Sequence, residues 1–334
     1  SVVAILDYAF ADCSALTTIT IPATLTTIGA GAFYWCSNLD IYSLPTSLEY
    51  IGDWAFVGCK SIKTINIGSS VKEIGTAPFY YCLSLTTITV ERSNNNYWSE
   101  NGVLLNKDKT RLIQYPCNAS AATYTVPSTV ETIGKYAFYS AQKLTTVDFS
   151  DSKGLSTISQ AAFASCASLR SLELPDGVQE VDSIAFSSCS ALSAVVLPAS
   201  LTRLGGKAFD KCTSLTSVTN QASTPQGITA DVFSADTYKS ATLYVPAKSV
   251  AAYSMANGWS QFMNITAIDI PDTETLFTTN GITYALRNID KTARIVRVEG
   301  MYVDVVIPAS VTYEKTTYPV TAVGDSALYR VNDL

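Results

Sequence analysis

Residues Ala55–Ile67 read AFVGCKSIKTINI, and two periodicities meet inside this stretch. Its first half places an Ala-Phe pair, a cysteine and an isoleucine at spacings of three residues, which suits one face of a short helical turn. In its second half Ile65 and Ile67 alternate with Thr64 and Asn66, as the inward and outward side chains of a strand do. The stretch therefore predicts a short helical turn followed by a strand with one buried face.

The same pattern recurs along the chain at intervals of mostly 23 residues. Its phenylalanine stands at Phe10, Phe33, Phe56, Phe79, Phe138, Phe163, Phe186 and Phe209. A cysteine follows three positions later in seven of these eight units, at Cys13, Cys36, Cys59, Cys82, Cys166, Cys189 and Cys212, and Ala141 replaces it in the other. Phe138 and Phe163 are 25 residues apart. Phe79 and Phe138 are 59 apart, which we interpret as one unit plus 36 inserted residues.

One such unit cannot bury its apolar side chains alone, whereas stacked units can. Proline follows several of the predicted strands, where it ends them because it cannot donate to a sheet ladder. Glycine often precedes the Ala-Phe pair, where a tight turn favours it. The chain is therefore predicted to form an α/β repeat solenoid, with a parallel β-sheet on one face and short helical or irregular segments on the other.

The strings IGAGAFYWCSNL, IGDWAFVGCKSI and LGGKAFDKCTSL resemble the signature of the BspA-like (treponemal-type) leucine-rich repeat of bacterial surface proteins. The resemblance covers about residues 1–270, with a further partial unit near the C-terminus. It implies a right-handed leucine-rich-repeat coil whose parallel sheet lies on the concave face. It also implies an exported protein, secreted or anchored at the outer membrane, that adheres to host or bacterial proteins, matrix proteins or glycans.

The repeated cysteines resemble the small interior residue of other leucine-rich repeats, and free buried cysteine behaves as a small hydrophobe. Disulfides are a weaker alternative, because the Cβ vectors of stacked cysteines would run parallel. A metal site is weaker still, since one sulfur per coil does not form a tetrahedron. Cys117 lies off the repeat and is expected to be the most exposed thiol.

Residues 91–127 form the insertion, and within it NGVLLNKDKTRLIQYP predicts a β-hairpin. A common structural elaboration is the simpler interpretation. The alternative is a projecting recognition loop, because function concentrates on loops held by a rigid scaffold. That loop would present Tyr97, Trp98 and Tyr115.

After Val218 the repeat dissolves, and residues 220–268 are predicted to cap the C-terminal end of the solenoid. A strand at 241–245 and a helix at 247–257 are expected there. Trp259 behind them suits a buried capping residue better than a sugar-stacking one. The solenoid domain thus spans residues 1–268.

Residues 269–275 suggest a short acidic linker, and residues 276–334 a β-rich segment that leads into a further, incomplete repeat. Strands are expected at 282–286, 293–298 and 303–307. The last unit would run from Val323-Gly324 to Leu334. Because the chain starts and stops within units, we expect it to be part of a longer array whose open ends could self-associate through strand edges.

Composition narrows the function classes. Histidine is absent, which excludes Ser-His-Asp and Cys-His catalysis as well as imidazole-based zinc sites. A net charge of −6 argues against nucleic acid, which needs a basic face. No apolar stretch is long enough for a membrane span, the N-terminus lacks the features of a signal peptide, and no motif implies a cofactor. An enzyme acting on glycans through two carboxylates remains a minor alternative.

The remaining candidate for a functional site is the outward face of the predicted sheet, whose side chains are mostly small and carry hydroxyl groups. Its candidate ligand-binding residues are Thr18, Thr20, Ile41, Thr64, Asn66, Thr87, Thr89, Thr146, Asp148, Ser171 and Glu173. The plain interpretation is that threonine favours strands and pairs well across a sheet. The functional interpretation is a face that docks a protein or a glycan, as solenoids often do. The competing hypothesis is a rigid spacer that displays other domains and binds nothing itself.

Overall fold

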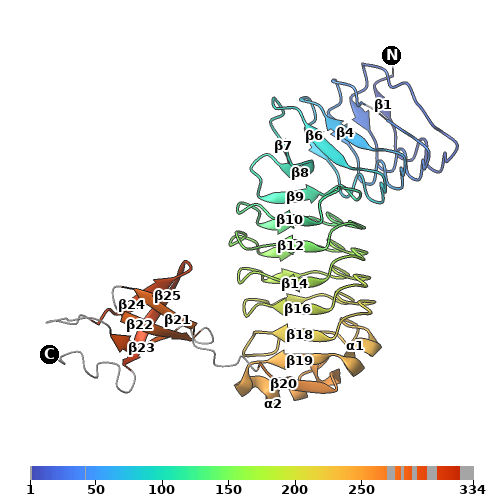
Figure 1. Cartoon of the computed structure of the whole chain (residues 1–334). Helices are drawn as coiled ribbons and strands as arrows, with labels where there is room; N and C mark the ends of the chain where they lie inside the picture. The colour runs from blue at the N-terminus through green and yellow to red at the C-terminus, as the bar shows by residue number, and fades with distance from the viewer. Residues whose placement is uncertain are drawn as a thin grey trace. The chain divides into compact units, whose positions relative to one another are not determined.

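The structure, a computed structural model, describes residues 2–41, 43–268, 275–279, 282–287, 292–298 and 307–323. The chain divides into two compact units, residues 1–268 and 269–334. The first unit is a stack of coils, and Figure 1 shows its strands lying side by side in ladders. Each unit is described by itself below.

Most coils of the first unit contribute two short strands, not the single strand predicted. In each coil, the strand before the recurring glycine position belongs to one sheet, which we call the narrow sheet. The strand after the cysteine belongs to the other, which we call the wide sheet. The narrow sheet contains β1 (Ala4–Ile5), β2 (Thr27–Ile28), β3 (Tyr50–Ile51), β5 (Glu73–Ile74), β11 (Thr132–Ile133), β13 (Thr157–Ile158), β15 (Glu180–Val181) and β17 (Arg203–Leu204). It is interrupted once, because β1-β2-β3-β5 and β11-β13-β15-β17 belong to separate ladders. Neighbouring coils pair in parallel, with Thr27 opposite Tyr50 and Ile28 opposite Ile51, for example.

The wide sheet is parallel as well, but it is interrupted twice. Its strands are β4 (Thr64–Ile67), β6 (Thr87–Val90), β10 (Thr123–Thr125), β12 (Thr146–Asp148), β14 (Ser171–Glu173), β16 (Ala194–Leu197), β18 (Ser217–Asn220), β19 (Thr242–Val245) and β20 (Asn264–Ala267). They form three separate ladders, β4-β6, β10-β12 and β14-β16-β18-β19-β20. In β4 the burial alternates as predicted, with Thr64 and Asn66 exposed and Ile65 and Ile67 buried.

The Ala-Phe segments are turns, and the helical turn predicted for them is wrong. The residues two before and two after the ring adopt a left-handed backbone in coil after coil, which no right-handed helix tolerates. These positions are Tyr8, Gly31, Trp54, Ala77, Tyr136, Ala161, Ile184 and Lys207 before it, and Asp12, Trp35, Gly58, Tyr81, Ser140, Ser165, Ser188 and Lys211 after it. Their alternation turns backbone N–H groups toward the next coil: Phe33 N–H donates to Ala55 O at 2.8 Å.

The phenylalanine rings stack face to face along the interior, with centroids 4.5 to 5.7 Å apart. There are two separate stacks. The first contains Phe10, Phe33, Phe56 and Phe79, and the second contains Tyr115, Phe138, Phe163, Phe186, Phe209 and Phe233. Tyr115 therefore takes the ring position of a coil that the sequence pattern missed, 23 residues before Phe138. The insertion is accordingly shorter than the 36 residues inferred from the spacing.

Six cysteines form a thiol ladder beside the rings. Each thiol donates to the carbonyl oxygen of the phenylalanine in the coil before it, at 2.9 to 3.2 Å; they are Cys36, Cys59, Cys82, Cys166, Cys189 and Cys212. All eight cysteines are free. Burial raises the pKa of Cys36 to about 11 and that of Cys212 to about 12. Cys13 in the first described coil is exposed.

Cys117 was expected to be the most exposed thiol, and this is wrong. It is 3% exposed, and its sulfur donates to Tyr139 O at 3.3 Å. Burial raises its pKa to about 12. Cys117 follows Tyr115 by two residues instead of three, so it does not fit the spacing, yet it lies inside the same coil.

The insertion forms β7 (Tyr97–Glu100) and β8 (Val103–Asn106), which pair antiparallel with each other, while β8 pairs antiparallel with β9 (Arg111–Gln114). This hairpin divides the interior into two hydrophobic cores. Leu104 packs in the first core, whereas its neighbours Val103 and Leu105 pack in the second. An apolar run of three is explained by a strand that is buried on both faces.

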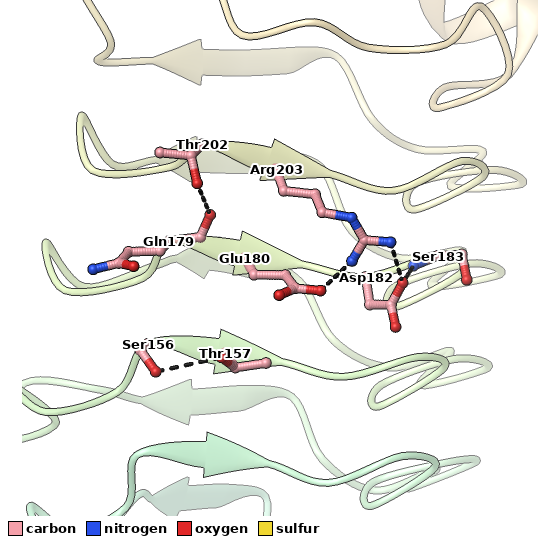
Figure 2. A network of polar contacts seen from close by, with 8 residues as sticks. All are labelled: Ser156, Thr157, Gln179, Glu180, Asp182, Ser183, Thr202 and Arg203. Atoms are coloured by element: carbon pink, nitrogen blue, oxygen red, sulfur yellow. Dashed lines mark hydrogen bonds and ion pairs between the residues drawn. The ribbon is translucent and has the colours of Figure 1, made fainter.

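Polar side chains connect coils outside these cores. In Figure 2, Arg203 on β17 reaches across to Glu180 and Asp182 of the preceding coil, and its contact to Asp182 measures 3.1 Å. Thr202 Oγ1 donates to Gln179 O at 3.0 Å beside it. Arg203 and Glu180 are largely solvated, so these pairs contribute little stability each.

After β18 the chain forms the only helices among the described residues: α1 (Ala235–Ser240), η1 (Ala247–Ser249), α2 (Val250–Met255) and η2 (Trp259–Gln261). Trp259 is fully buried, and its Nε1 donates to Gln226 O at 2.8 Å. With at most six residues each, the helices of the described ranges are too short to cross a bilayer.

The second unit is one five-stranded sheet in the order β21-β22-β23-β25-β24. Its strands are β21 (Thr275–Thr279), β22 (Ile282–Arg287), β23 (Thr292–Val298), β24 (Ser310–Tyr313) and β25 (Thr316–Val323). Tyr284, Ile295 and Tyr318 belong to its core. The predicted linker up to residue 274, the predicted strand at 303–306 and the incomplete repeat at 324–334 lie outside the described residues.

Candidate functional site

Hollows open on the wide-sheet face at places where strand pairing is interrupted. The larger, which we call the β12–β14 hollow, has a volume of about 910 Å³ and is lined by Thr146, Asp148, Ser171 and Glu173 among others. These are four of the residues predicted from the sequence. They lie on two adjacent strands that belong to different ladders.

An enlarged coil explains this interruption. The interval of 25 residues between Phe138 and Phe163 leaves two extra residues, and Ser152 in the widened turn is fully buried, donating to Val126 O at 3.1 Å. One backbone hydrogen bond still crosses the gap, from Arg170 N–H to Thr145 O at 3.2 Å. Beyond it β12 and β14 separate, and the hollow opens between them.

The β12–β14 hollow carries more negative than positive charge. Asp148, Glu173 and Asp176 contribute carboxylates, and Lys153 contributes the single ammonium group of its lining. The Ser150 backbone N–H donates to Asp148 Oδ1 at 2.9 Å and lowers the pKa of that carboxyl group. Asp148 is therefore ionised at neutral pH, and Glu173 and Asp176 are exposed to solvent.

A second, smaller hollow of about 390 Å³ is lined by Thr18, Thr20 and Ile41. Residues 17–21 and 40–41 were predicted as strands, but they form no regular ladder. Ile41 was expected to face outward, and this is wrong: it is 5% exposed and packs in the first core. An isoleucine gains more free energy from burial than the threonine at the matching position of the next coil.

The remaining predicted residues lie between these hollows on the paired strands β4 and β6. Thr64, Asn66 and Thr89 are exposed, and Thr87 is half-buried. Thr89 Oγ1 donates to Asn66 Oδ1 at 2.9 Å, so part of this polar surface is satisfied by its own neighbours. This stretch supports the view that threonine serves the ladder there.

Two of the three aromatic side chains expected on a projecting recognition loop are buried. Tyr115 is 2% exposed inside the ring stack, and Tyr97 is 9% exposed, its hydroxyl accepting from Ile74 N–H at 2.7 Å. Trp98 is half-buried, with the ammonium groups of Lys107 and Lys109 at 5.5 and 5.0 Å from its ring. Tyr97 packs in the first core and Tyr115 packs in the second.

Within the described ranges, no group of three or more His, Cys, Asp or Glu side chains is arranged to hold a metal ion. The carboxylates of the β12–β14 hollow are not an exception.

A coil built from parallel strands, a buried ring stack and a buried thiol defines a leucine-rich-repeat solenoid. The chain matches the BspA-type leucine-rich repeat region in six copies, over residues 1–102 and 114–241, and it belongs to that family. The gap in the match, at 103–113, covers β8, the turn that follows it and most of β9. No curated protein matches the chain.

Solved structures share this fold. A leucine-rich repeat protein from Eubacterium ventriosum aligns with a TM-score of 0.56 at 24% identity, over 79% of this chain and 70% of that one. The pneumococcal vaccine antigen PcpA aligns with a TM-score of 0.55 at 21% identity, over 81% of this chain and 85% of that one. At this identity the similarity establishes the fold.

Proposed function

We propose that this chain is a non-catalytic leucine-rich-repeat protein of the bacterial surface or its surroundings, and that it binds a protein ligand at the β12–β14 hollow. Its family and the bacterial source of the similar structures support the setting. The description of PcpA as a vaccine antigen supports exposure outside the cell. The competing function is a rigid spacer.

The observation that carries the proposal is the hollow itself. A spacer needs only an unbroken ladder, as β14 to β20 have, and nothing in that role requires the sheet to open between β12 and β14. The opening exposes strand edges beside Glu173 and Asp176, for which no ion pair is found among the described residues. Unpaired edges and charges of one sign are features that a protein ligand can complement.

Binding of the purified chain to immobilised matrix proteins and bacterial surface proteins tests the proposal. The variant Thr146→Arg/Ser171→Arg places two long cationic side chains in the hollow, and it should weaken binding at least about tenfold. The matched control Thr64→Arg/Thr87→Arg changes the same face where β4 and β6 are paired, and it should bind as the original chain does. If both variants bind equally well, the site lies elsewhere. If nothing binds, the spacer function is favoured.

A further inference from the structure

A cluster of aromatic side chains covers the Ala-Phe turns of the first half of the solenoid. We call it the aromatic patch; it contains Tyr34, Trp35, Tyr80, Tyr81, Tyr136 and Tyr139. Its members touch in sequence: Trp35 lies 5.5 Å from Tyr81, and Tyr80 lies 4.3 Å from Tyr139, between ring centroids. All six side chains are half-buried, so part of each ring faces solvent.

The fold does not require aromatic residues at these places. Trp35 and Tyr81 are both two residues after the ring, in the left-handed region at φ 55° and 61°. Later coils hold Ser165 and Ser188 at the same position with the same backbone. A bulky side chain with a positive φ costs free energy that a smaller residue reduces or avoids. The left-handed backbone belongs to every coil, but the choice of a bulky aromatic side chain at this position is not explained by the turn.

The neighbouring coil is adapted to hold these rings. A Cβ atom on Gly58 would lie 2.8 Å from the Trp35 ring, so only glycine leaves room for the indole where it lies. Gly58 also has a φ of +73°, which glycine adopts freely. The indole is thus fixed in one orientation across the turn of the next coil, as a preorganised binding surface requires.

One cation accompanies the patch. Lys60 Nζ lies 4.8 Å from the Trp35 ring centroid and 5.5 Å from that of Tyr81. Among the described residues no carboxylate forms an ion pair with it. The rings attract the ammonium group but leave its charge uncompensated. An anionic group of a ligand would supply that charge.

We propose that the aromatic patch binds an acidic oligosaccharide, at a site separate from the β12–β14 hollow. The electron-rich faces of the rings suit sugar C–H groups, which are polarised by neighbouring oxygens. The tyrosine hydroxyls suit sugar hydroxyls, and Lys60 pairs with a carboxylate or sulfate of the sugar.

Calorimetric titration of the full chain with three probes of equal length tests this proposal: a galacturonate hexamer, a sulfated dextran oligosaccharide and the unmodified dextran oligosaccharide. We expect a charged probe to bind and the neutral one to bind at least about tenfold more weakly. The charged probe that binds more tightly identifies the acidic group as carboxylate or sulfate.

Two variants and one control locate the site. Lys60→Met keeps the aliphatic stem and removes the charge, and Tyr81→Ser installs the residue that later coils use. Each should weaken the charged probe at least about tenfold. Lys211→Met removes a cation from the Ala-Phe turn of a later coil whose only aromatic ring, Phe209, is buried in the stack, and it should leave binding unchanged. Urea midpoints of all variants confirm folding.

Several results overturn the proposal. These are the absence of binding by all three probes, equal weakening by Lys211→Met and Lys60→Met, or neutral and charged probes that bind alike. A protein ligand that depends on Tyr81 while no oligosaccharide binds would make the patch a protein-docking surface instead. None of these results affects the β12–β14 hollow, which its own variants test.

Discussion

Replacing Lys211 by glycine should stabilise the protein, although glycine usually weakens folded chains. Lys211 occupies a left-handed turn position with a φ of 59°, and its side chain is exposed and forms no ion pair within the described residues. A non-glycine residue costs about 1–2 kcal/mol in this region. Glycine loses about 0.5–1 kcal/mol more in backbone entropy on folding. The net gain is about 0.5–1 kcal/mol for Lys211→Gly.

A matched control separates strain from side-chain loss. Lys63 is also an exposed lysine of the solenoid, but its φ is not positive. Lys63→Gly makes the same chemical change without relieving strain, so it should lower the free energy of unfolding by about 0.5–1 kcal/mol. The same substitution thus has opposite signs at two positions.

Urea unfolding of the full chain, followed by tryptophan fluorescence, measures both variants. Trp259, one of four tryptophans, is fully buried and 6.0 Å from Phe233, whose ring stacks on Phe209 in the coil of Lys211, so this end of the solenoid contributes to the emission. The midpoint should rise for Lys211→Gly and fall for Lys63→Gly at an unchanged slope. If Lys211→Gly lowers the midpoint as much as the control does, the left-handed positions carry no strain and the reasoning is refuted.

Three further perturbations follow from the interior. Burial raises the pKa of the Cys212 thiol from 9.0 to about 12, so the neutral buried thiol contributes its full stability below pH 9, and this contribution is lost as the pH rises toward 12. The urea midpoint should therefore fall from pH 8 to pH 10, and it should fall less in Cys212→Ala. The buried Tyr115 hydroxyl has no hydrogen-bond partner, so Tyr115→Phe should raise the free energy of unfolding by about 1 kcal/mol, whereas Tyr115→Ala should lower it by about 3–5 kcal/mol. The thermal midpoints should shift in the same directions. Gly58→Ala should displace the Trp35 ring and lower stability by about 1–3 kcal/mol, seen as altered tryptophan emission and an earlier urea midpoint; unchanged emission would contradict the contact.

The repeat could be predicted from the sequence because each coil meets the same environment. Phe163 and Phe186 occupy equivalent places, so the same residue type recurs at a fixed interval. The number of coils was underestimated where that equivalence is imperfect. Tyr115 replaces a phenylalanine and Cys117 comes one residue early, and a pattern that requires both residues at fixed spacing passes over them.

The second sheet and the left-handed turns were missed for a different reason. Two-residue strands such as Thr27–Ile28 are too short to show alternation, and spacings of three arise from a turn as readily as from a helix. Serine, lysine, tryptophan and isoleucine at positive φ give no local indication of it. Their conformation is imposed by hydrogen bonds to the next coil, which are contacts of long range in sequence.

The candidate site was predicted in part. The polar outward positions of β12 and β14 followed from alternation, which placed Thr146 and Ser171 on the surface. The hollow that these residues border arises from the interval of 25 residues between Phe138 and Phe163. This interval is visible in the sequence, but nothing in the sequence indicates that it interrupts the strand pairing. The aromatic patch could not be foreseen, because it joins residues of separate coils at positions that later coils fill with non-aromatic residues.

The interruption between β12 and β14 also gives the solenoid an uneven mechanical response. On that face one backbone hydrogen bond spans the gap, whereas the narrow sheet continues unbroken through β11, β13 and β15. A tensile load along the stacking axis would separate β12 from β14 on the wide-sheet face while the narrow sheet stays paired. The solenoid would therefore bend at this coil before neighbouring coils stretch. A ligand bound in the gap would then connect β12 to β14 and resist this opening, so a shear force on the protein would act first on the ligand's own contacts.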